Sequence, residues 1–344
     1  MYRLNNMPPS KHTILPRTGA LVAASLLLLS TACHTTSPPW PPPPAPDEAA
    51  IPPLLDDPLA QDALRRVLEG DARCAQGDRP FLPGLTTDDV RPSGAPRLRA
   101  RAYLVYDHDA GRVLMARHAG RPYPIASITK LAAALVLADT RPDPDEVLTI
   151  LWEDKYYLLP TRSKLRVGGK YRAGDLLYQA LLSSDNRAMI ALVRQSRLPL
   201  GVFRDAMNRR ARAIGLLHAH FEEPTGLDPR NVCSARDAVV LLEAALRDPL
   251  LARVLTTPEH RYQRLDRPAT IAARTTNRLF LRSQWDIQAS KTGYIVMSES
   301  CLVTRAVLED GRTVSIAILG ARGVDGRYPV AEAIRQYLER HPDT

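Results

Sequence analysis

Residues 127–138, SITKLAAALVLA, decide the fold of this chain. From Leu131 onward the segment is apolar at every position, and a helix that is apolar on all faces is buried in the centre of a domain. Pro124 and Ala126, which lie just before Ser127, are typical of a helix start. The sequence therefore predicts a helix over about 127–139, with the other elements of the domain packed around it.

The first turn of this predicted helix carries Ser127 and Lys130, three positions apart. Positions i and i+3 share one face of a helix, so the Lys130 amine can reach the Ser127 hydroxyl. Burial disfavours the charged amine and lowers its pKa, which makes the amine a base, and the helix N-terminus favours negative charge nearby. The alternative is a serine that caps the helix beside a lysine on a partly wet turn. The pair alone does not decide between a catalytic serine and lysine and a helix cap.

A second polar fragment, Ser184-Asp185-Asn186, lies between predicted helices at 173–183 and 186–196. Side chains at such a junction can project from it, so Ser184 could relay a proton between the Lys130 amine and a leaving nitrogen. Asn186 could hold a substrate amide and the Lys130 side chain. The alternative is that Ser184 or Asp185 only caps the second helix.

The third fragment is Lys291-Thr292-Gly293, which we predict at the end of a strand over about 287–292. Lys291 offers fixed positive charge, Thr292 a hydroxyl, and Gly293 allows a ligand to approach the backbone closely. These groups suit a substrate carboxylate, whereas the alternative is an edge-strand lysine followed by a turn glycine. In this order, the three fragments match a serine acyl-transfer site that uses lysine as its base.

The charge composition supports a special role for these lysines. Only six of the 46 basic residues are lysines, and the others are arginines. An arginine cannot give up its proton in a protein, whereas a desolvated lysine can. The formal net charge is +9, and without residues 1–32, which hold three basic and no acidic residues, it is +6, which suits an anionic cell envelope. Because the sequence has no interleaved basic and aromatic pattern, we predict no nucleic-acid partner.

Residues 1–32 have the pattern of an export signal. Basic residues precede an apolar run over 21–29, which is too short to be a good transmembrane span. The small residues just before Cys33 are similar to a bacterial lipobox, so we predict a lipoprotein signal peptide over 1–32 and lipidation of Cys33. The protein would then lie in the bacterial periplasm, anchored to a membrane by that lipid. The alternative is an ordinary cleaved signal followed by an incidental cysteine.

The rest of the chain divides into three predicted parts. Residues 33–56 form a Pro-rich tether, which is either an extended polyproline II spacer or a linker with no defined reach. Residues 57–98 form a helix, over 57–76, followed by an irregular extension. The main domain occupies 99–344.

Within the main domain, strands are expected at both ends and helices between them. The predicted strands span 102–106, 112–116, 287–292, 300–308 and 312–320. The predicted helices span 127–139, 173–183, 186–196, 203–214, 235–246 and 328–340. This order predicts an α+β fold, in which an antiparallel sheet built from both chain ends packs against a helical cluster.

The remaining cysteines and the histidines give no sign of a metal site. Cys74, Cys233 and Cys301 leave at least one free thiol in an exported protein, and their pairing stays open. No cysteine spacing suits zinc. His218 and His220 could share one face of a strand and hold a metal, but we interpret them as histidines near the cleft wall. We therefore predict no metal.

The three catalytic fragments and their surroundings resemble the penicillin-binding protein and serine β-lactamase superfamily. The resemblance covers about 99–340 and is greatest for the low-molecular-mass D-alanyl-D-alanine carboxypeptidases and endopeptidases. It rests on residues 125–131, 165–168, 182–188, 224–227, 231–237 and 276–279. The segments 218–221 and 285–288 resemble the endopeptidase branch.

The resemblance implies a β-lactamase/transpeptidase-like fold and a peptidoglycan DD-peptidase that needs no cofactor. Ser127 would attack a D-alanine carbonyl, and the oxyanion would be held by backbone N–H groups of Ser127 and Tyr294. The substrate-binding residues would be Lys291, Thr292, Gly293 and Tyr294. The implied partners are peptidoglycan stem peptides, with β-lactam antibiotics as inhibitors. Whether the enzyme is an endopeptidase or a carboxypeptidase stays open.

One segment departs from the family pattern, and two other functions stay open. After Tyr294 the segment 295–300 lacks the usual threonine and Ala-Gly pair, which leaves substrate preference unsettled. A serine β-lactamase would share the first chemical step, and a non-enzymatic envelope scaffold would bind peptidoglycan through a degenerate site. Glu222 and Glu223 could activate a deacylating water, but their surroundings fit the peptidase pattern, so we assign them no catalytic role.

Overall fold

The computed structural model describes residues 57–78, 82–155, 161–282 and 284–344. The predicted signal peptide, Cys33 and the Pro-rich tether lie outside these residues. The helix predicted over 57–76 is observed as α1, Pro58–Arg73, followed by a short π-helical turn, Cys74–Asp78. Within the described part of the chain, no helix is both long enough and apolar enough to cross a membrane.

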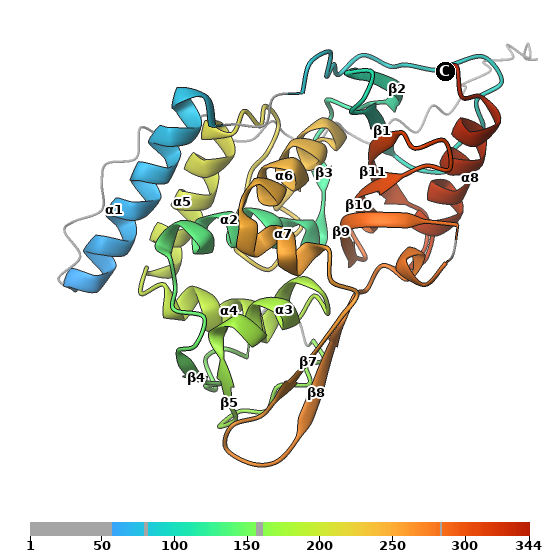
Figure 1. The fold of residues 1–344 in the computed structure, drawn as a ribbon. Coiled ribbons are helices and arrows are strands. Elements are labelled where there is room, and N and C mark those ends of the chain that lie inside the picture. Colours follow the sequence, from blue (N-terminus) through green and yellow to red (C-terminus); the bar gives the residue numbers. More distant parts are fainter. Residues whose placement is uncertain (1–56, 79–81, 156–160, 283) are drawn as a thin grey trace, which may run out of the picture. The chain divides into compact units, whose positions relative to one another are not determined.

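A five-stranded antiparallel sheet forms one side of the main domain (Figure 1). Its order is β2-β1-β11-β10-β9. The strands are β1 Ala102–Asp107, β2 Arg112–Arg117, β9 Asp286–Ile295, β10 Glu299–Val307 and β11 Thr313–Ala321. Because β1 from the first end of the domain pairs with β11 from the last, the prediction of a sheet built from both chain ends is confirmed.

Alternating side chains of β1 show why both faces of this sheet are covered. Leu104 contributes to a core shared with α2, whereas Tyr103 and Val105 contribute to a second core under α8. All three side chains are buried, as expected for a strand with helices on both faces. The helices of the main domain are α2 Thr129–Thr140, α3 Ala173–Leu181, α4 Asn186–Gln195, α5 Leu200–Ala213, α6 Ala235–Arg247, α7 Pro249–Leu255 and α8 Arg327–Arg340.

Helix α2 lies at the centre of the larger core, as its sequence predicts. Every residue from Thr129 to Leu137 is buried, including Lys130. A 3-10 turn, Ala126–Ile128, precedes α2 and carries Ser127. The central helix therefore holds the nucleophile candidate and its base on one rigid element.

Several short elements were not predicted from the sequence. They are β3 Tyr123–Pro124 paired with β6 Val232–Cys233, β4 Val147–Thr149 paired with β5 Lys170–Arg172, β7 Glu259–Gln263 paired with β8 Thr270–Arg274, and a 3-10 turn over Arg278–Leu281. In Figure 1, β7 and β8 form a long hairpin beyond α3. These strands are too short or too polar to show a clear period-two pattern.

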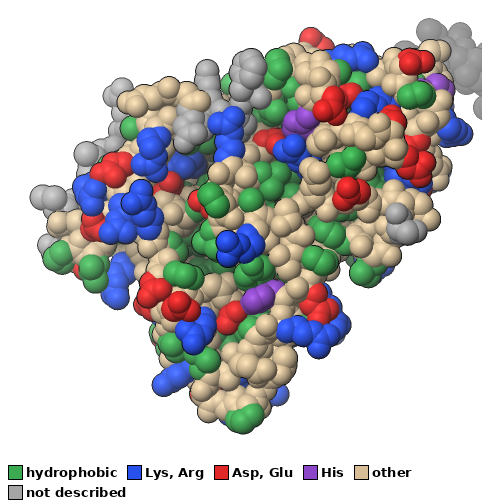
Figure 2. Space-filling view, viewed as in Figure 1, with side chains coloured by type: hydrophobic (Ala, Val, Ile, Leu, Met, Phe, Trp, Pro, Cys, Tyr) green, Lys and Arg blue, Asp and Glu red, His purple; other side chains and the backbone are tan. Residues whose placement is uncertain are grey.

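Helix α1 is attached to the domain by a buried charge cluster. Arg210 of α5 donates to Asp71 of α1 at 2.8 Å and also pairs with Asp139 of α2. Burial raises the pKa of Asp139 to about 7, while Arg210 acts in the opposite direction. On the face seen in Figure 2, Lys and Arg side chains gather over the region of α1 and α5, with acidic side chains among them. The segment 57–73 is thus packed on the helix that carries Lys130.

One detail of the sequence prediction needs correction. Lys291-Thr292-Gly293 was expected at a strand end, but β9 continues through Ile295, and these residues pair with β10. The unusual segment 295–300 therefore comprises the last residue of β9, the tight turn over 296–298 and the first two residues of β10. Of the three cysteines of the described chain, all buried, Cys233 and Cys301 are free thiols.

Candidate active site

Ser127 is presented by a turn whose backbone is strained. The preceding Ala126 has a φ of 47°, which a residue with a side chain rarely adopts. Gly226, with a φ of 84°, lies against this turn, and a Cβ on it would meet the Ala126 carbonyl oxygen at 2.0 Å. Only glycine fits there. The turn carrying Ser127 is thus held in place by a neighbouring loop that has no room for a side chain.

Lys130 has three acceptors around its amine. Its Nζ lies 3.0 Å from Ser127 Oγ, 2.5 Å from Asn186 Oδ1 and 2.6 Å from the Thr225 carbonyl oxygen. Burial lowers the pKa of Lys130 from 10.5 to about 8, although the charges of Glu223 and Asp185 oppose this shift. As a neutral amine, Lys130 can keep N–H bonds to Asn186 and Thr225 and turn its lone pair towards the Ser127 hydroxyl.

The backbone around Thr225 is held by Glu223, a residue to which we assigned no catalytic role from the sequence. The buried Glu223 carboxylate accepts hydrogen bonds from backbone N–H groups of Thr225, Gly226 and Leu227 at 2.6–2.7 Å. It also accepts 2.6 and 2.7 Å bonds from the Thr225 hydroxyl and the Asn231 amide. In this position Glu223 organises the loop beside Lys130.

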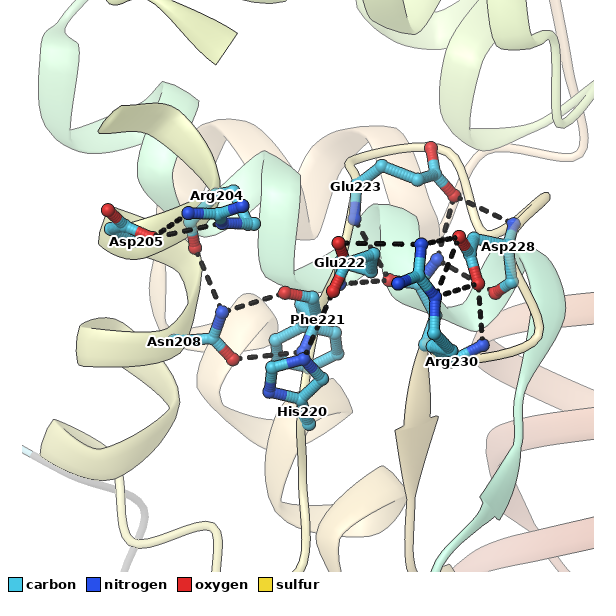
Figure 3. A network of polar contacts seen from close by, with 10 residues as sticks. Arg204, Asp205, Asn208, His220, Phe221, Glu222, Glu223, Asp228 and Arg230 are labelled. Atoms are coloured by element: carbon cyan, nitrogen blue, oxygen red, sulfur yellow. Dashed lines mark hydrogen bonds and ion pairs between the residues drawn. The ribbon is translucent and has the colours of Figure 1, made fainter. Parts of the chain in front are cut away.

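Figure 3 shows the polar network around this loop. Asn208 of α5 binds both backbone groups of Phe221, at 2.7 and 2.9 Å. Arg230 pairs with Asp228 at 2.6 Å on the other side of the loop. Asn208 thus ties the loop between α5 and β6 to helix α5, and Arg230 and Asp228 pair within the loop. Both contacts help to keep the Thr225 carbonyl within reach of Lys130.

The junction of α3 and α4 brings Asn186 and Ser184 into the site. Asp185 caps α4 by accepting from Ala188 N at 3.2 Å, as one of the alternatives predicted. Ser184 has a φ of 58°, a strained conformation that turns its hydroxyl to Lys291 at 2.9 Å. Asn186 contacts Lys130 as expected, whereas the partner of Ser184 in this structure is Lys291.

Lys291 is also buried, at 1% exposure. Its amine donates to Ser184 Oγ at 2.9 Å and to the Thr292 carbonyl at 3.0 Å. Burial, together with the charges of Lys130 and Arg327, lowers the pKa of Lys291 well below its usual range. The expected fixed positive charge is therefore disfavoured in the unliganded site, and an incoming carboxylate would restore it.

The backbone of β9 lies directly against the nucleophile turn. A Cβ on Gly293 would meet the Ile125 carbonyl oxygen at 2.3 Å and Ser127 N at 3.2 Å. Tyr294, the next residue, has a side chain that is 40% exposed. The predicted oxyanion donors, Ser127 and Tyr294, thus lie on two backbones in close contact.

Two further side chains hydrogen-bond to β9 on this side and were not among the predicted site residues. The buried Arg327, at the start of α8, donates to the carbonyl oxygens of Gly293 and Cys301, both at 2.9 Å. Thr276 and Thr292 share a hydroxyl–hydroxyl bond of 2.6 Å. Thr276 lies in one of the segments that resemble the family. Arg327 lies in no such segment, and no local sequence pattern distinguishes it from the many other arginines.

The two histidines near the site make separate contacts. His220 Nε2 lies 3.4 Å from Glu222, and His218 Nδ1 lies 3.9 Å from Asp237. In the described chain, no three His, Cys, Asp or Glu side chains are grouped as metal ligands would be.

Comparisons with known proteins agree with this geometry. A family model described as D-alanyl-D-alanine carboxypeptidase (peptidase S11) matches residues 89–323. The D-alanyl-D-alanine endopeptidase of Pseudomonas aeruginosa is 36% identical over 70% of this chain and 78% of its own length. That of Escherichia coli is 31% identical over 76% of this chain and 84% of its own.

Solved structures show the same fold. The D-alanyl-D-alanine carboxypeptidase of Mycobacterium tuberculosis H37Rv superposes with a TM-score of 0.62 at 27% identity. The match covers 72% of this chain and 95% of that one. The expected transpeptidase-like α+β fold is confirmed. The chain belongs to the D-alanyl-D-alanine carboxypeptidase family and is a serine-type peptidoglycan DD-peptidase.

Proposed function

We propose that this protein is a D-alanyl-D-alanine endopeptidase that cleaves peptidoglycan cross-links through an acyl-enzyme on Ser127. One observation carries the proposal: a buried Lys130 amine with a lowered pKa lies 3.0 Å from the Ser127 hydroxyl. This is hydrogen-bond distance for a base and its nucleophile.

In the first step, neutral Lys130 takes the Ser127 proton as Ser127 Oγ bonds to the D-alanine carbonyl carbon. The carbonyl electrons move to oxygen, and backbone N–H groups of Ser127 and Tyr294 stabilise that charge. The amide C–N bond then breaks, and the leaving nitrogen receives a proton. That proton passes from Lys130, with Ser184 close to the leaving group and Asn186 holding the amine.

Deacylation returns the site to its starting state. A water molecule adds to the ester carbonyl, its proton moves to Lys130, and Ser127 leaves as the hydroxyl. Lys291 and Thr292 hold a substrate carboxylate, which compensates the unfavourable charge on buried Lys291. β-Lactams, which present a strained amide and a carboxylate, are bound as substrate mimics.

Three endopeptidases among the relatives are 31–36% identical to this chain, whereas the carboxypeptidases are 25–30% identical. We therefore assign it to the endopeptidases.

The test is digestion of purified cross-linked muropeptide dimers and of pentapeptide monomers by wild type and Ser127→Ala. Conversion of dimers to monomers by wild type alone is expected.

Other outcomes contradict the proposal in distinct ways. Loss of terminal D-alanine without dimer cleavage would make the protein a carboxypeptidase. Fast penicillin hydrolysis would make it a β-lactamase. Binding of the muropeptides without cleavage, retained in Ser127→Ala, would favour the non-enzymatic peptidoglycan-binding scaffold.

We also propose that the protein acts in the bacterial periplasm, held to a membrane by lipid on Cys33. Support comes from the lipobox-like sequence and from relatives that act on D-alanyl-D-alanine bonds. Metabolic labelling of wild type and Cys33→Ala with a fatty-acid analogue tests the anchor. Label on wild type alone is expected, and an unlabelled wild type would contradict it.

A further inference from the structure

A basic pocket lies between the β4–β5 connection, the first turn of α4 and the tip of the β7–β8 hairpin. It has a volume of about 720 Å³. Five basic side chains line it: Lys155, Lys164, Arg166, Arg187 and Arg267. Like charges gathered in a concave surface repel one another and concentrate a positive potential there. An anionic ligand would relieve that repulsion.

No acidic side chain of the described residues lies within ion-pair distance of these five bases. Two acids close in sequence have other partners, since Asp154 pairs with Arg194 at 2.9 Å and Asp266 with Arg264 at 2.6 Å. The neighbouring Glu153 is exposed and makes no ion pair. None of the five basic side chains of the pocket is therefore neutralised by a direct ion pair within the described residues.

The contacts that these bases do make are to neutral groups. Lys164 donates to the Ala272 carbonyl at 2.9 Å, and Arg187 donates to the Leu165 carbonyl. Lys155 lies over the Trp152 ring, 4.8 Å from its centroid. Such contacts position the cations and leave their charge available to a ligand.

The basic pocket adjoins the catalytic residues. Its wall residue Ser163 donates to Asp185 at 2.8 Å, and Arg187 follows Asn186, which contacts Lys130. One short segment, 184–187, thus borders both the nucleophile site and the basic pocket. A substrate held at Ser127 can continue across this segment into the pocket.

We propose that the basic pocket is a subsite for the free carboxylates of peptidoglycan stem peptides, selecting strands whose carboxylates are not amidated. This rests on the proposed function, because the ligand is the remainder of the strand cleaved at Ser127. Carboxylates fit guanidinium and ammonium donors in geometry and charge. The subsite increases productive binding of charged strands.

The test uses two cross-linked muropeptide dimers that differ only in whether their stem carboxylates are free or amidated. The full-length wild type should cleave the free form with a kcat/KM about tenfold higher, and the preference should shrink at high salt. The double variant Arg166→Gln/Arg267→Gln should lose the preference by slowing cleavage of the free form alone. Both side chains are exposed and make no hydrogen bond or ion pair in the described structure.

A matched control removes the same charge elsewhere. Arg97→Gln/Arg99→Gln, at two exposed positions before β1, should keep the wild-type preference. The rate of acylation by a fluorescent penicillin should be equal in all three proteins, because that small ligand does not reach the pocket. Equal cleavage of both dimers by wild type would overturn the proposal, as would equal slowing of both dimers by the pocket variant.

Binding separates this proposal from the proposed function. If wild type cleaves neither dimer, fluorescence polarisation with Ser127→Ala still decides, because tighter binding of the free form supports the subsite and equal binding refutes it. Co-sedimentation with phosphatidylglycerol vesicles tests a lipid headgroup as the source of the anion. Vesicle binding lost only in the pocket variant, with unchanged dimer preference, would overturn the assignment to stem peptides.

Discussion

In the proposed mechanism, acylation of Ser127 should depend steeply on pH, because the proposed base, Lys130, must be neutral. Burial lowers the pKa of Lys130 from 10.5 to about 8. At 1.36 kcal/mol per pH unit, this shift is about 3 kcal/mol against the charged amine. At pH 7 about one molecule in ten then has a neutral Lys130. This fraction is about 300-fold larger than it would be for a lysine with the ordinary pKa.

The sign of the effect follows from the direction of the shift. Below pH 8 the charged form predominates, so the second-order rate of acylation should rise almost tenfold per pH unit and level off above about pH 8. Stopped-flow measurement with a fluorescent penicillin between pH 6 and 10 reports this free-enzyme pKa. A rate that is flat between pH 6.5 and 9.5 would refute the assignment of Lys130 as the base.

Lys130→Arg gives a second readout of the same claim. Arginine keeps the positive charge but cannot release its proton, so acylation should fall by a factor of about 10²–10⁴ at every pH. The thermal unfolding curve shows whether the variant folds. A folded variant that acylates within tenfold of wild type would contradict the role of Lys130.

Three further substitutions test how the site is held. Gly293→Ala should slow acylation by at least about 100-fold, because its methyl group would push β9 from the nucleophile turn, whereas Gly201→Ala, in open space, should not. Glu223→Gln should lower the free energy of unfolding by about 2–4 kcal/mol, measured with urea, while the more exposed Glu222→Gln should change it little. Arg210→Met should lower the free energy of unfolding by about 3 kcal/mol and expose α1 to limited proteolysis, because Asp71 and Asp139 lose their nearest cation and keep only Arg209 at 3.6 Å and Arg73 at 3.8 Å; unchanged protease resistance would contradict this docking.

The sequence predicted the parts of the fold that depend on strong periodicity. The buried α2 follows from its continuous apolar run, and the central sheet follows from alternating strands with clear turns. The β7–β8 hairpin was missed because its strands are mostly polar and face solvent. Helix α7 was missed because its seven residues are too few to show a helical period.

The candidate catalytic residues could be proposed from the sequence because each lies in a short motif, and the contacts of Lys130 with Ser127 and Asn186 were expected, but other contacts of the site were not. Ser184 binds Lys291 only because its backbone adopts a strained φ of 58°, which no local pattern specifies. Arg327 reaches Gly293 across the sheet from a segment 34 residues away. Such long-range contacts are set by packing and have no signature in the sequence.

The central claim is that Ser127 is the nucleophile, and mass spectrometry of the penicillin-treated protein tests it most directly. The account predicts that the peptide containing Ser127 gains the full mass of the antibiotic, and that Ser127→Ala gains none. An unmodified Ser127 peptide in a folded wild type, or an adduct on another residue, would contradict it.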